Sequence, residues 1–446
     1  MLKLFTITLQ PEVRGVIGSM TVKVASISSS FLLFTFAARV MGEEHFGHFA
    51  VFFSAASMLA VVAAFGQEML IIRLWSKYIA ENRLDLAKGS IVFGLIVSAI
   101  GGVIGASVIA LYFGNTDSVS AAVSAGAYVA AAILLLFLSS LARTVVSILA
   151  GDGQRELTAL FFANLALIAC YFLELELSMI WVINLLTIGK LTAVSVQVYC
   201  LLRVIRQSYP KLFQTQHQFD AAAWLPSSCR LWIASALETS NQYLDVILIG
   251  LLLDPIAAGA YFVATRLANG FASIADAFNM FAMRHFPELY FRRDSVGMAR
   301  LLTTLAVLTA FAVAGGLAVI VVAGHWILLL FGEEYVAYYH VLLVLCIGTA
   351  AMAASGPAAP VLMVTGSESP YLRIVALSVA LRITGFVVLI PVFEILGAAV
   401  ATAFSLIVMA VLIGNKSQAM TGMNVTATRI FFPGSVAATS TKETQT

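Results

Sequence analysis

The chain has 446 residues, of which 61% are hydrophobic and only 11% are charged. Soluble domains carry about 25% charged residues, so this chain lacks the polar surface that a water-soluble globule of its length needs. Its formal net charge of +2 is too small to indicate a nucleic-acid partner. We therefore expect an all-α membrane protein, because long apolar runs are typical of membrane helices and not of β-barrel strands.

Twelve apolar segments approach the roughly 20 helical residues that cross a hydrocarbon core. The expected spans are 16–38, 46–67, 89–113, 119–142, 157–175, 179–202, 229–253, 256–280, 302–331, 338–364, 371–392 and 395–414. The first is expected to be retained, because no signal-peptide cleavage pattern precedes it. Asp254 and Pro255 predict a helix start, whereas Pro357 and Pro360 predict a break in the tenth span.

The connections between spans alternate between cation-rich and cation-poor. By the positive-inside rule the cation-rich set is cytoplasmic, so both termini of this multi-pass membrane protein are expected in the cytoplasm. An even number of spans independently requires both termini to lie on the same side of the membrane. Arg155 is the cation of the connection between the fourth and fifth spans, where Gly151-Asp152-Gly153 is expected to form a turn.

The central connection 203–228 divides the chain into two six-helix bundles, 1–202 and 229–414, followed by a polar cytoplasmic tail, 415–446, that we expect to be disordered. The halves resemble repeats, since residues 47–51 (GHFAV) align with 259–263 (GAYFV) and weaker matches follow in the same order. Six spans per half give both halves the same orientation. The axis relating them is then a pseudo-two-fold along the membrane normal, with a substrate cavity expected between them.

Ionisable residues within the spans cost about 2.5–3.5 kcal/mol each, so they are expected to face protein or water. Counting from helix ends places four near the midplane and two nearer the cytoplasm. The four are Lys190, Asp245, Arg266 and Arg382, and the two are Lys23 and Glu238. These six are our candidate cavity residues. Four cations against two carboxylates make the interior net positive, which suits an anionic substrate such as a pyrophosphate head group.

Two spans at equivalent places in the halves carry a polar face at helical spacing. In the first span it is made by Lys23, Ser26 and Ser30, and in the seventh by Glu238, Asn241, Gln242 and Asp245. Structural alternatives remain open. Asp245 and Arg266 would neutralise each other, Lys190 would pair with Glu238 or a backbone carbonyl, and the serines would serve helix packing. Arg382 has no obvious partner in the sequence.

Enzyme and metal sites are disfavoured. The four cysteines show no CxxC spacing, which favours buried small hydrophobes over a zinc site or a disulfide framework. His45 and His48, with Glu43 and Glu44, have ligand-like spacing, but a solvated turn is the simpler interpretation. No catalytic triad or metal cofactor is expected, and the outer loops are too short to hold a catalytic domain.

Three segments carry recognisable motifs. Residues 46–73 (FGHFAVFFSAASMLAVVAAFGQEMLIIR) have a Gly-aromatic start and a later Phe-Gly before a run that ends in Arg73. In this they resemble the second-span signature of the polysaccharide transporter (Wzx-type O-antigen flippase) family. Residues 259–271 (GAYFVATRLANGF) resemble its eighth-span signature, which contains Arg266. Residues 329–345 (LLFGEEYVAYYHVLLVL) resemble its outer turn before the tenth span.

This resemblance implies membership of the multidrug/oligosaccharidyl-lipid/polysaccharide exporter superfamily, with two helical bundles that work by alternating access. It implies a lipid-linked oligosaccharide as substrate, held by an isoprenoid pyrophosphate and flipped across the inner membrane for surface polysaccharide biosynthesis. It also implies a cationic cavity role for Arg266. The expected partners are this lipid, membrane lipid, a coupling cation (H+ or Na+) and polysaccharide polymerase machinery, with no nucleic acid.

Within this hypothesis the candidate arginines bind the pyrophosphate through paired hydrogen bonds and the lysines bind it more weakly. The carboxylates set the resting charge and are candidates for the coupling cation. Two alternatives remain. A multidrug antiporter of the same superfamily characteristically uses an acidic residue in the first span, and residues 16–38 contain none. A major-facilitator transporter would carry Gly-x-x-x-Asp-Arg-x-Gly between spans two and three, which is absent.

The topology is testable by cysteine-accessibility labelling. The termini and residues 203–228 should react only from the cytoplasm, whereas cysteines placed at Asp117 and Glu333 should react only from the opposite side, because the cation-poor connections lie there. Labelling of position 117 from the cytoplasm alone would overturn this topology.

Overall fold

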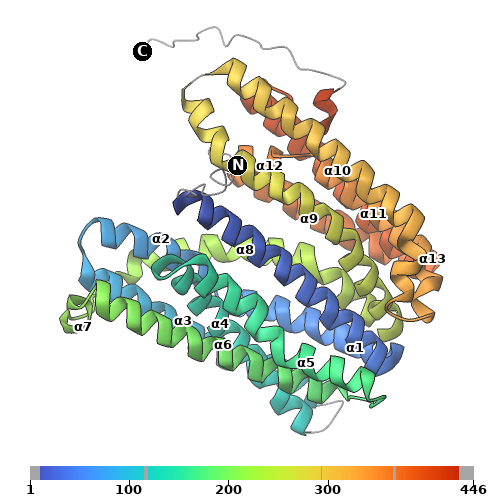
Figure 1. The fold of residues 1–446 in the computed structure, drawn as a ribbon, viewed down its shortest axis with the longest axis horizontal. Helices are drawn as coiled ribbons and strands as arrows, with labels where there is room; N and C mark the ends of the chain where they lie inside the picture. Colours follow the sequence, from blue (N-terminus) through green and yellow to red (C-terminus); the bar gives the residue numbers. More distant parts are fainter. Residues whose placement is uncertain (1–10, 115–118, 293, 365–367, 431–446) are drawn as a thin grey trace, which may run out of the picture. The chain divides into compact units, whose positions relative to one another are not determined.

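The computed structural model describes residues 11–114, 119–292, 294–364 and 368–430. Within these ranges the regular elements are all helices, so the predicted all-α class is confirmed (Figure 1). Asp117 lies outside the described residues. Contacts between residues group the chain into two compact units, Met1–Ile247 and Leu248–Thr446. That boundary falls inside a helix rather than in the 203–228 connection, and the division into two six-helix repeats stays a prediction.

The first unit contains, in chain order, α1 (Pro11–Ala63), α2 (Gln67–Ala80), α3 (Leu84–Gly114), α4 (Val119–Val145), η1 (Leu149–Thr158), α5 (Ala159–Phe172), α6 (Met179–Ser208), α7 (Lys211–Gln214) and most of α8 (Ala221–Leu252). The second contains α9 (Pro255–Phe291), α10 (Ser295–Leu329), η2 (Glu334–Tyr338), α11 (Tyr339–Ala354), α12 (Ala358–Val364), α13 (Glu368–Thr421) and η3 (Ala427–Ile430). In the first unit, α4 packs side by side with both α3 and α6 (Figure 1).

Each predicted span lies on a described helix. α1 and α13 contain two spans apiece, joined across non-helical residues at Gly42 (φ 72°) and Glu394 (φ 50°). The tenth span is divided into α11 and α12 next to Pro357, as predicted. Asp254 Oδ1 accepts a hydrogen bond from Ala257 N at 2.7 Å, which confirms the predicted start of α9.

Eight helical stretches in the described residues are long and apolar enough to cross a membrane. Two of them, Thr21–Ala80 and Ser369–Thr421, have 60 and 53 residues and so exceed a single crossing. α8 and α9 are not among the eight, although they have 32 and 37 residues. Polar residues such as Glu238 and Asp245 on α8 lower its hydropathy, so this helix needs protein or water against one face.

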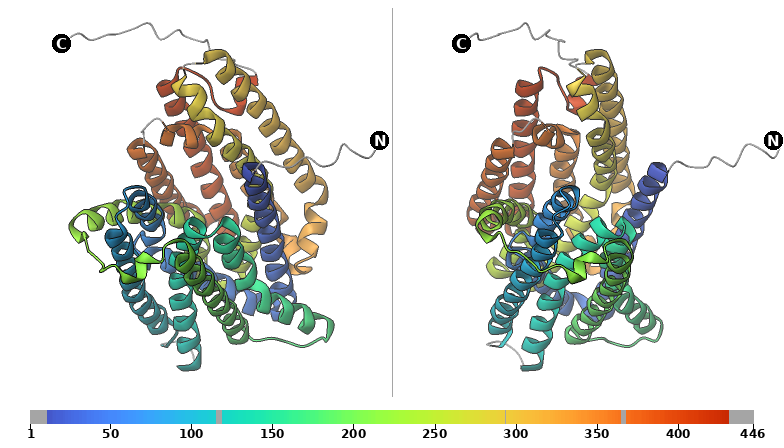
Figure 2. Two further views of the ribbon diagram at one scale, coloured as in Figure 1. Left: turned by 60° about the vertical axis from the view of Figure 1, so that its left-hand side comes forward. Right: turned by 90° about the vertical axis from the view of Figure 1, so that its left-hand side faces the viewer.

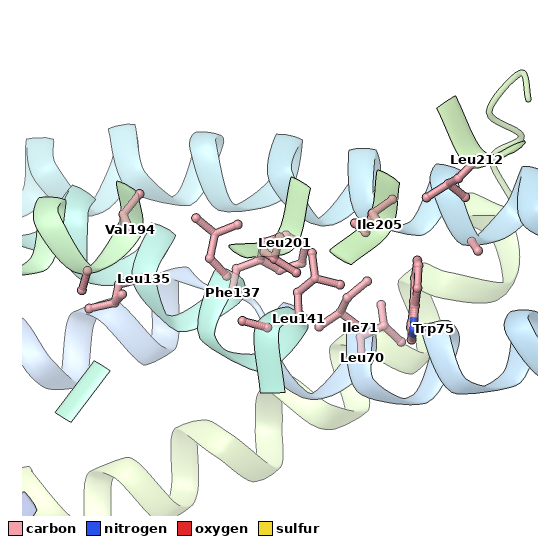
Figure 3. Close-up of a cluster of buried hydrophobic side chains, with 14 of the residues drawn as sticks. Leu70, Ile71, Trp75, Leu135, Phe137, Leu141, Val194, Leu201, Ile205 and Leu212 are labelled. Carbon is pink, nitrogen blue, oxygen red and sulfur yellow. The ribbon is translucent and has the colours of Figure 1, made fainter. Parts of the chain in front are cut away.

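Helix α2 is an element that hydropathy did not predict. It is amphipathic, with Leu70, Ile71 and Trp75 buried and Arg73 and Lys77 exposed. Figure 3 shows its buried side chains in a hydrophobic cluster with α4, α6 and α7. The partners labelled there are Leu135, Phe137, Leu141, Val194, Leu201, Ile205 and Leu212. α2 therefore fills the end of the first unit's core while its cations stay at the surface.

The first turns of α8 are fastened to the junction between α1 and α2. Trp232 Nε1 donates to the carbonyl of Val62 at 2.8 Å, and Gln67 Nε2 donates to Ser228 Oγ at 2.7 Å. Between these bonds Gly66 adopts φ 69°, and a Cβ there would lie 2.8 Å from Trp232 N. Glycine is therefore required both by the left-handed backbone and by the close approach of α8.

In the second unit α11 packs against both α9 and α13, and α10 packs against α9 (Figure 2). α13 continues to Thr421, and η3 follows it. Arg429 of η3 is buried, with Nη1 donating to the carbonyl of Asn424 at 2.8 Å and Nε to Thr303 Oγ1 at 3.0 Å. The expectation of a disordered tail is therefore wrong for residues 415–430, because these bonds tie it to α10. Residues 431–446 lie outside the described residues.

The two left-handed glycines give a matched test of the α8 contact. Gly42→Ala should lower the free energy of unfolding by backbone strain alone, about 1–3 kcal/mol, because Gly42 lies at φ 72° and ψ 170° and nothing lies within 4 Å of its added Cβ. Gly66→Ala should cost clearly more, since its methyl group overlaps the backbone of α8. Thermal unfolding in detergent measures both. Equal losses of melting temperature would contradict the close packing at Gly66.

Candidate functional site

The predicted cavity residues are distributed over both units. Lys23 (α1), Lys190 (α6), Glu238 and Asp245 (α8) belong to the first, and Arg266 (α9) and Arg382 (α13) belong to the second. Lys23 and Glu238 are exposed, whereas Asp245 is only 6% exposed. Within the first unit, Lys190 lies in a group of polar residues that sequence reasoning had not connected.

That group is built on η1, a π-helical segment that runs directly into α5. The fifth span therefore begins near Leu149 and not at 157, and Gly151-Asp152-Gly153 is helical and not a turn, so both expectations were wrong. Arg155 belongs to this span and not to a connection. π-Helical segments widen the backbone by one residue per turn and are frequent at functional sites.

Close packing holds η1 in place. A Cβ on Gly151 would lie 2.5 Å from the carbonyl oxygen of Ser139 and 2.7 Å from Arg143 N, so only glycine lets η1 approach α4 this closely. Gln197 of α6, fully buried, donates from Nε2 to Ser139 Oγ at 2.8 Å and to the carbonyl of Gly151 at 3.0 Å. The amide thus joins three helical segments and fixes the register of η1.

Five residues from four helical elements then form what we call the charge cluster: Ser26, Tyr128, Arg155, Glu156 and Lys190. Arg155 donates from Nη2 and Nε to Glu156 Oε1 at 2.7 and 2.8 Å. Ser26 Oγ donates to Glu156 Oε2 at 3.2 Å. Lys190 Nζ lies 4.8 Å from the centroid of the Tyr128 ring and within electrostatic range of Glu156.

The charge cluster changes the interpretation of two predictions. Lys190 has Glu156 as its acidic neighbour, where sequence reasoning had offered Glu238 or a carbonyl. The polar face of α1 contacts η1 and α5, because Asn164 of α5 donates to Ser29 Oγ at 3.0 Å beside the bond from Ser26. Arg155 is also within electrostatic range of Asp152 and Glu68, so its charge is balanced by more than Glu156. The net positive interior of the spans stays a prediction.

A second buried network lies in the second unit. Arg382 is 3% exposed, and its Nε donates to Ser405 Oγ at 2.9 Å. Ser405 Oγ donates in turn to the carbonyl of Thr402 at 2.9 Å, and Thr402 Oγ1 shares a hydrogen bond of 2.7 Å with the hydroxyl of Tyr261. Arg382 therefore has a hydrogen-bond partner on the other side of the break in α13 at Glu394, and the network extends to α9.

The structure places the remaining candidates on α1, α8 and α9. The guanidinium carbon of Arg266 lies 4.6 Å from the centroid of the Phe262 ring, a cation–π contact on its own helix. The pairing of Asp245 with Arg266 stays a prediction. His45 and His48 lie in helix α1 rather than in a turn. Among the described residues no three possible ligands converge on a metal site.

Comparisons with known proteins agree with this architecture. The family model described as "Polysaccharide biosynthesis protein" matches residues 13–283. An uncharacterized membrane protein, MJ1068 of Methanocaldococcus jannaschii, is 54% identical over 44 residues, which are 10% of this chain. The match spans 9% of that relative's length, so it carries little about the whole protein.

Solved structures share the fold over most of the chain. An inward-facing multidrug resistance transporter of the MATE family has a TM-score of 0.71 at 10% identity, covering 88% of this chain and 94% of its own. The lipid II flippase MurJ, in an inward closed conformation, has a TM-score of 0.66 at 12% identity, covering 90% and 87%. A MATE transporter from Vibrio cholerae has a TM-score of 0.60 at 16% identity, covering 92% and 98%.

The network around Arg382 gives a stability test. Ser405→Ala should lower the free energy of unfolding by about 1–3 kcal/mol, because it removes a partner of a buried guanidinium. Thr384→Ala on the same helix is the control, since that hydroxyl is exposed and bonds only within its own helix, to the carbonyl of Ala380. The measurement is the midpoint of thermal unfolding in detergent. Equal midpoints for the two variants would show that Arg382 does not depend on Ser405.

Proposed function

Because the chain belongs to the polysaccharide biosynthesis protein family, we propose that it flips an isoprenoid-pyrophosphate-linked oligosaccharide across the bacterial inner membrane. The family and the fold shared with MATE transporters and MurJ support a membrane transporter. The substrate, the direction of transport and alternating access belong to the proposal. So do the cytoplasmic termini and delivery of the sugar to polysaccharide polymerase machinery.

The observation that carries the proposal is the charge cluster. Its helices are membrane spans, yet it holds two cations, Arg155 and Lys190, with one carboxylate, Glu156. Cations inside a span are costly, and they normally mark a substrate or ion pathway. A diphosphate carries two or more negative charges and cannot cross hydrocarbon unaided. A guanidinium replaces part of its hydration through paired hydrogen bonds, and an ammonium adds charge without that geometry.

The other candidate residues extend this role. Arg382 and Arg266 remain proposed cations for the substrate. Lys23 keeps its proposed place as a weaker cation, and Asp245 and Glu238 remain proposed sites for a coupling cation, H+ or Na+. The lipid tail stays in the bilayer during transfer, while the sugar moves through a hydrated path as the units change their access.

A multidrug or cation antiporter of the same superfamily is the second candidate. One observation favours it: Glu156 is bonded to Ser26, so a carboxylate lies against the first span even though that span has no acidic residue of its own. Such a carboxylate would suit a coupling cation. The guanidinium of Arg155 and the ammonium of Lys190 beside it suit an anionic substrate, and the match to the polysaccharide biosynthesis family favours the flippase.

A deletion strain tests the function. Lipid-linked repeat units should accumulate on the cytoplasmic leaflet, and the wild-type chain should clear them. Lys190→Gln should clear them at least tenfold more slowly, because it removes one of the two cluster cations. Lys77→Gln is the matched control, since that ammonium also lies over a tyrosine ring, 5.5 Å from the centroid of Tyr78, but on the surface side of α2.

Leaflet-specific chemical labelling of the lipid-linked sugar gives the measurement. If the deletion altered only drug or cation tolerance and left the sugar distribution unchanged, the antiporter would replace the flippase. If Lys190→Gln and Lys77→Gln transported equally well, the charge cluster would lose its place in the proposal.

A further inference from the structure

The carboxylate of Glu156 already occupies the positions at which an anionic ligand would bind Arg155. Two guanidinium donors, Nη2 and Nε, converge on Glu156 Oε1 at 2.7 and 2.8 Å. The other oxygen, Oε2, accepts the hydroxyl of Ser26 at 3.2 Å. Phosphoryl oxygens are bound by the same paired donors. Substrate and Glu156 therefore cannot use this edge of the guanidinium at the same time.

The pair is open to a ligand. Arg155 and Glu156 are consecutive residues of η1, and their side chains turn toward each other to form the bond. The side chains are 37% and 33% exposed, which leaves a face of each accessible to a ligand. Lys190 adds positive charge from α6 and attracts Glu156 electrostatically. A carboxylate displaced from Arg155 thus has a second cation and the hydroxyl of Ser26 beside it.

We propose that Glu156 is an internal competitor for the substrate's phosphate, which is exchanged for a phosphoryl oxygen on Arg155 during each transport cycle. This inference rests on the proposed function and deepens it. In the empty protein Glu156 accepts the hydrogen bonds of a guanidinium that lies in a membrane span, where a charge without hydrogen bonds is costly. In the loaded protein the diphosphate provides that compensation, and Glu156 turns to Lys190 and Ser26.

Competition of this kind explains how a site with two cations releases its ligand. A ligand must outcompete a carboxylate that is held next to Arg155, so weakly bound single charges are rejected and a diphosphate is accepted. The same carboxylate returns to Arg155 as the ligand leaves, which speeds release. Removal of the carboxylate should therefore strengthen binding and slow transport together, whereas loss of a merely structural contact would weaken both.

The test uses inorganic pyrophosphate as the probe, titrated into the purified full-length chain by calorimetry. Glu156→Gln should bind pyrophosphate at least tenfold more tightly than wild type and should discriminate less against inorganic phosphate. Glu156→Asp, whose shorter side chain weakens the pair, should fall between them. Arg155→Ala should abolish binding. Transport of the lipid-linked sugar should decrease in Glu156→Gln despite its tighter binding.

Asp85→Asn is the matched control. It removes one carboxylate and one arginine pair, with Arg83 at 3.0 Å, at the start of α3, and it should bind like wild type. Size-exclusion chromatography verifies that each variant is folded, and Glu156→Asp keeps the test decisive if Glu156→Gln fails to fold.

Unchanged or weaker pyrophosphate binding in the Glu156 variants, with binding still lost in Arg155→Ala, would refute the competition and leave the cationic site. Absence of binding in wild type and Glu156→Gln alike would refute both the inference and the proposed diphosphate substrate.

Discussion

A polar or charged group inside a membrane span has to be solvated by the protein itself, because hydrocarbon offers no hydrogen bonds. The internal bonds of this chain follow that constraint. Arg155 is paired with Glu156, Arg382 is bonded to Ser405, and the amide of Gln197 takes up a backbone carbonyl of η1. The bonds of Arg382 and Gln197 join separate helical segments. The bond between Arg155 and Glu156 lies within η1 and leaves part of each side chain accessible to another partner. Helix packing and charge compensation are therefore set by the same residues.

This overlap gives the functional residues a structural foundation. The charge cluster depends on η1, and η1 depends on the absence of a side chain at Gly151 and on the buried amide of Gln197. In the second unit the buried arginine connects both limbs of α13 through Ser405 and reaches Tyr261 of α9 through Thr402. Substitutions of the small and uncharged partners should thus disturb charge placement without touching a charged residue.

Hydropathy predicted the spans well, because burial in lipid requires about 20 apolar residues whatever the tertiary contacts are. It missed α2, whose apolar side packs on protein, and it began the fifth span late because Arg155 and Glu156 interrupt the apolar run. A signal was present: Lys190 needed an anion, and a fifth span extended upstream would have supplied Glu156. The partner of Arg382 could not be read from the sequence, since Ser405 differs in no way from the other serines until α13 is folded.

The order found after α13 has a practical consequence for tagging. Reporter enzymes and fluorescent proteins are commonly joined to the last hydrophobic segment of a membrane protein, which by composition alone would be close to residue 415. A junction there would delete Arg429 and, with it, the bonds to Thr303 and to the carbonyl of Asn424. Fusions joined beyond residue 430 keep these bonds, and fusion proteins built in that way for purification or localisation should retain the packing of η3 against α10.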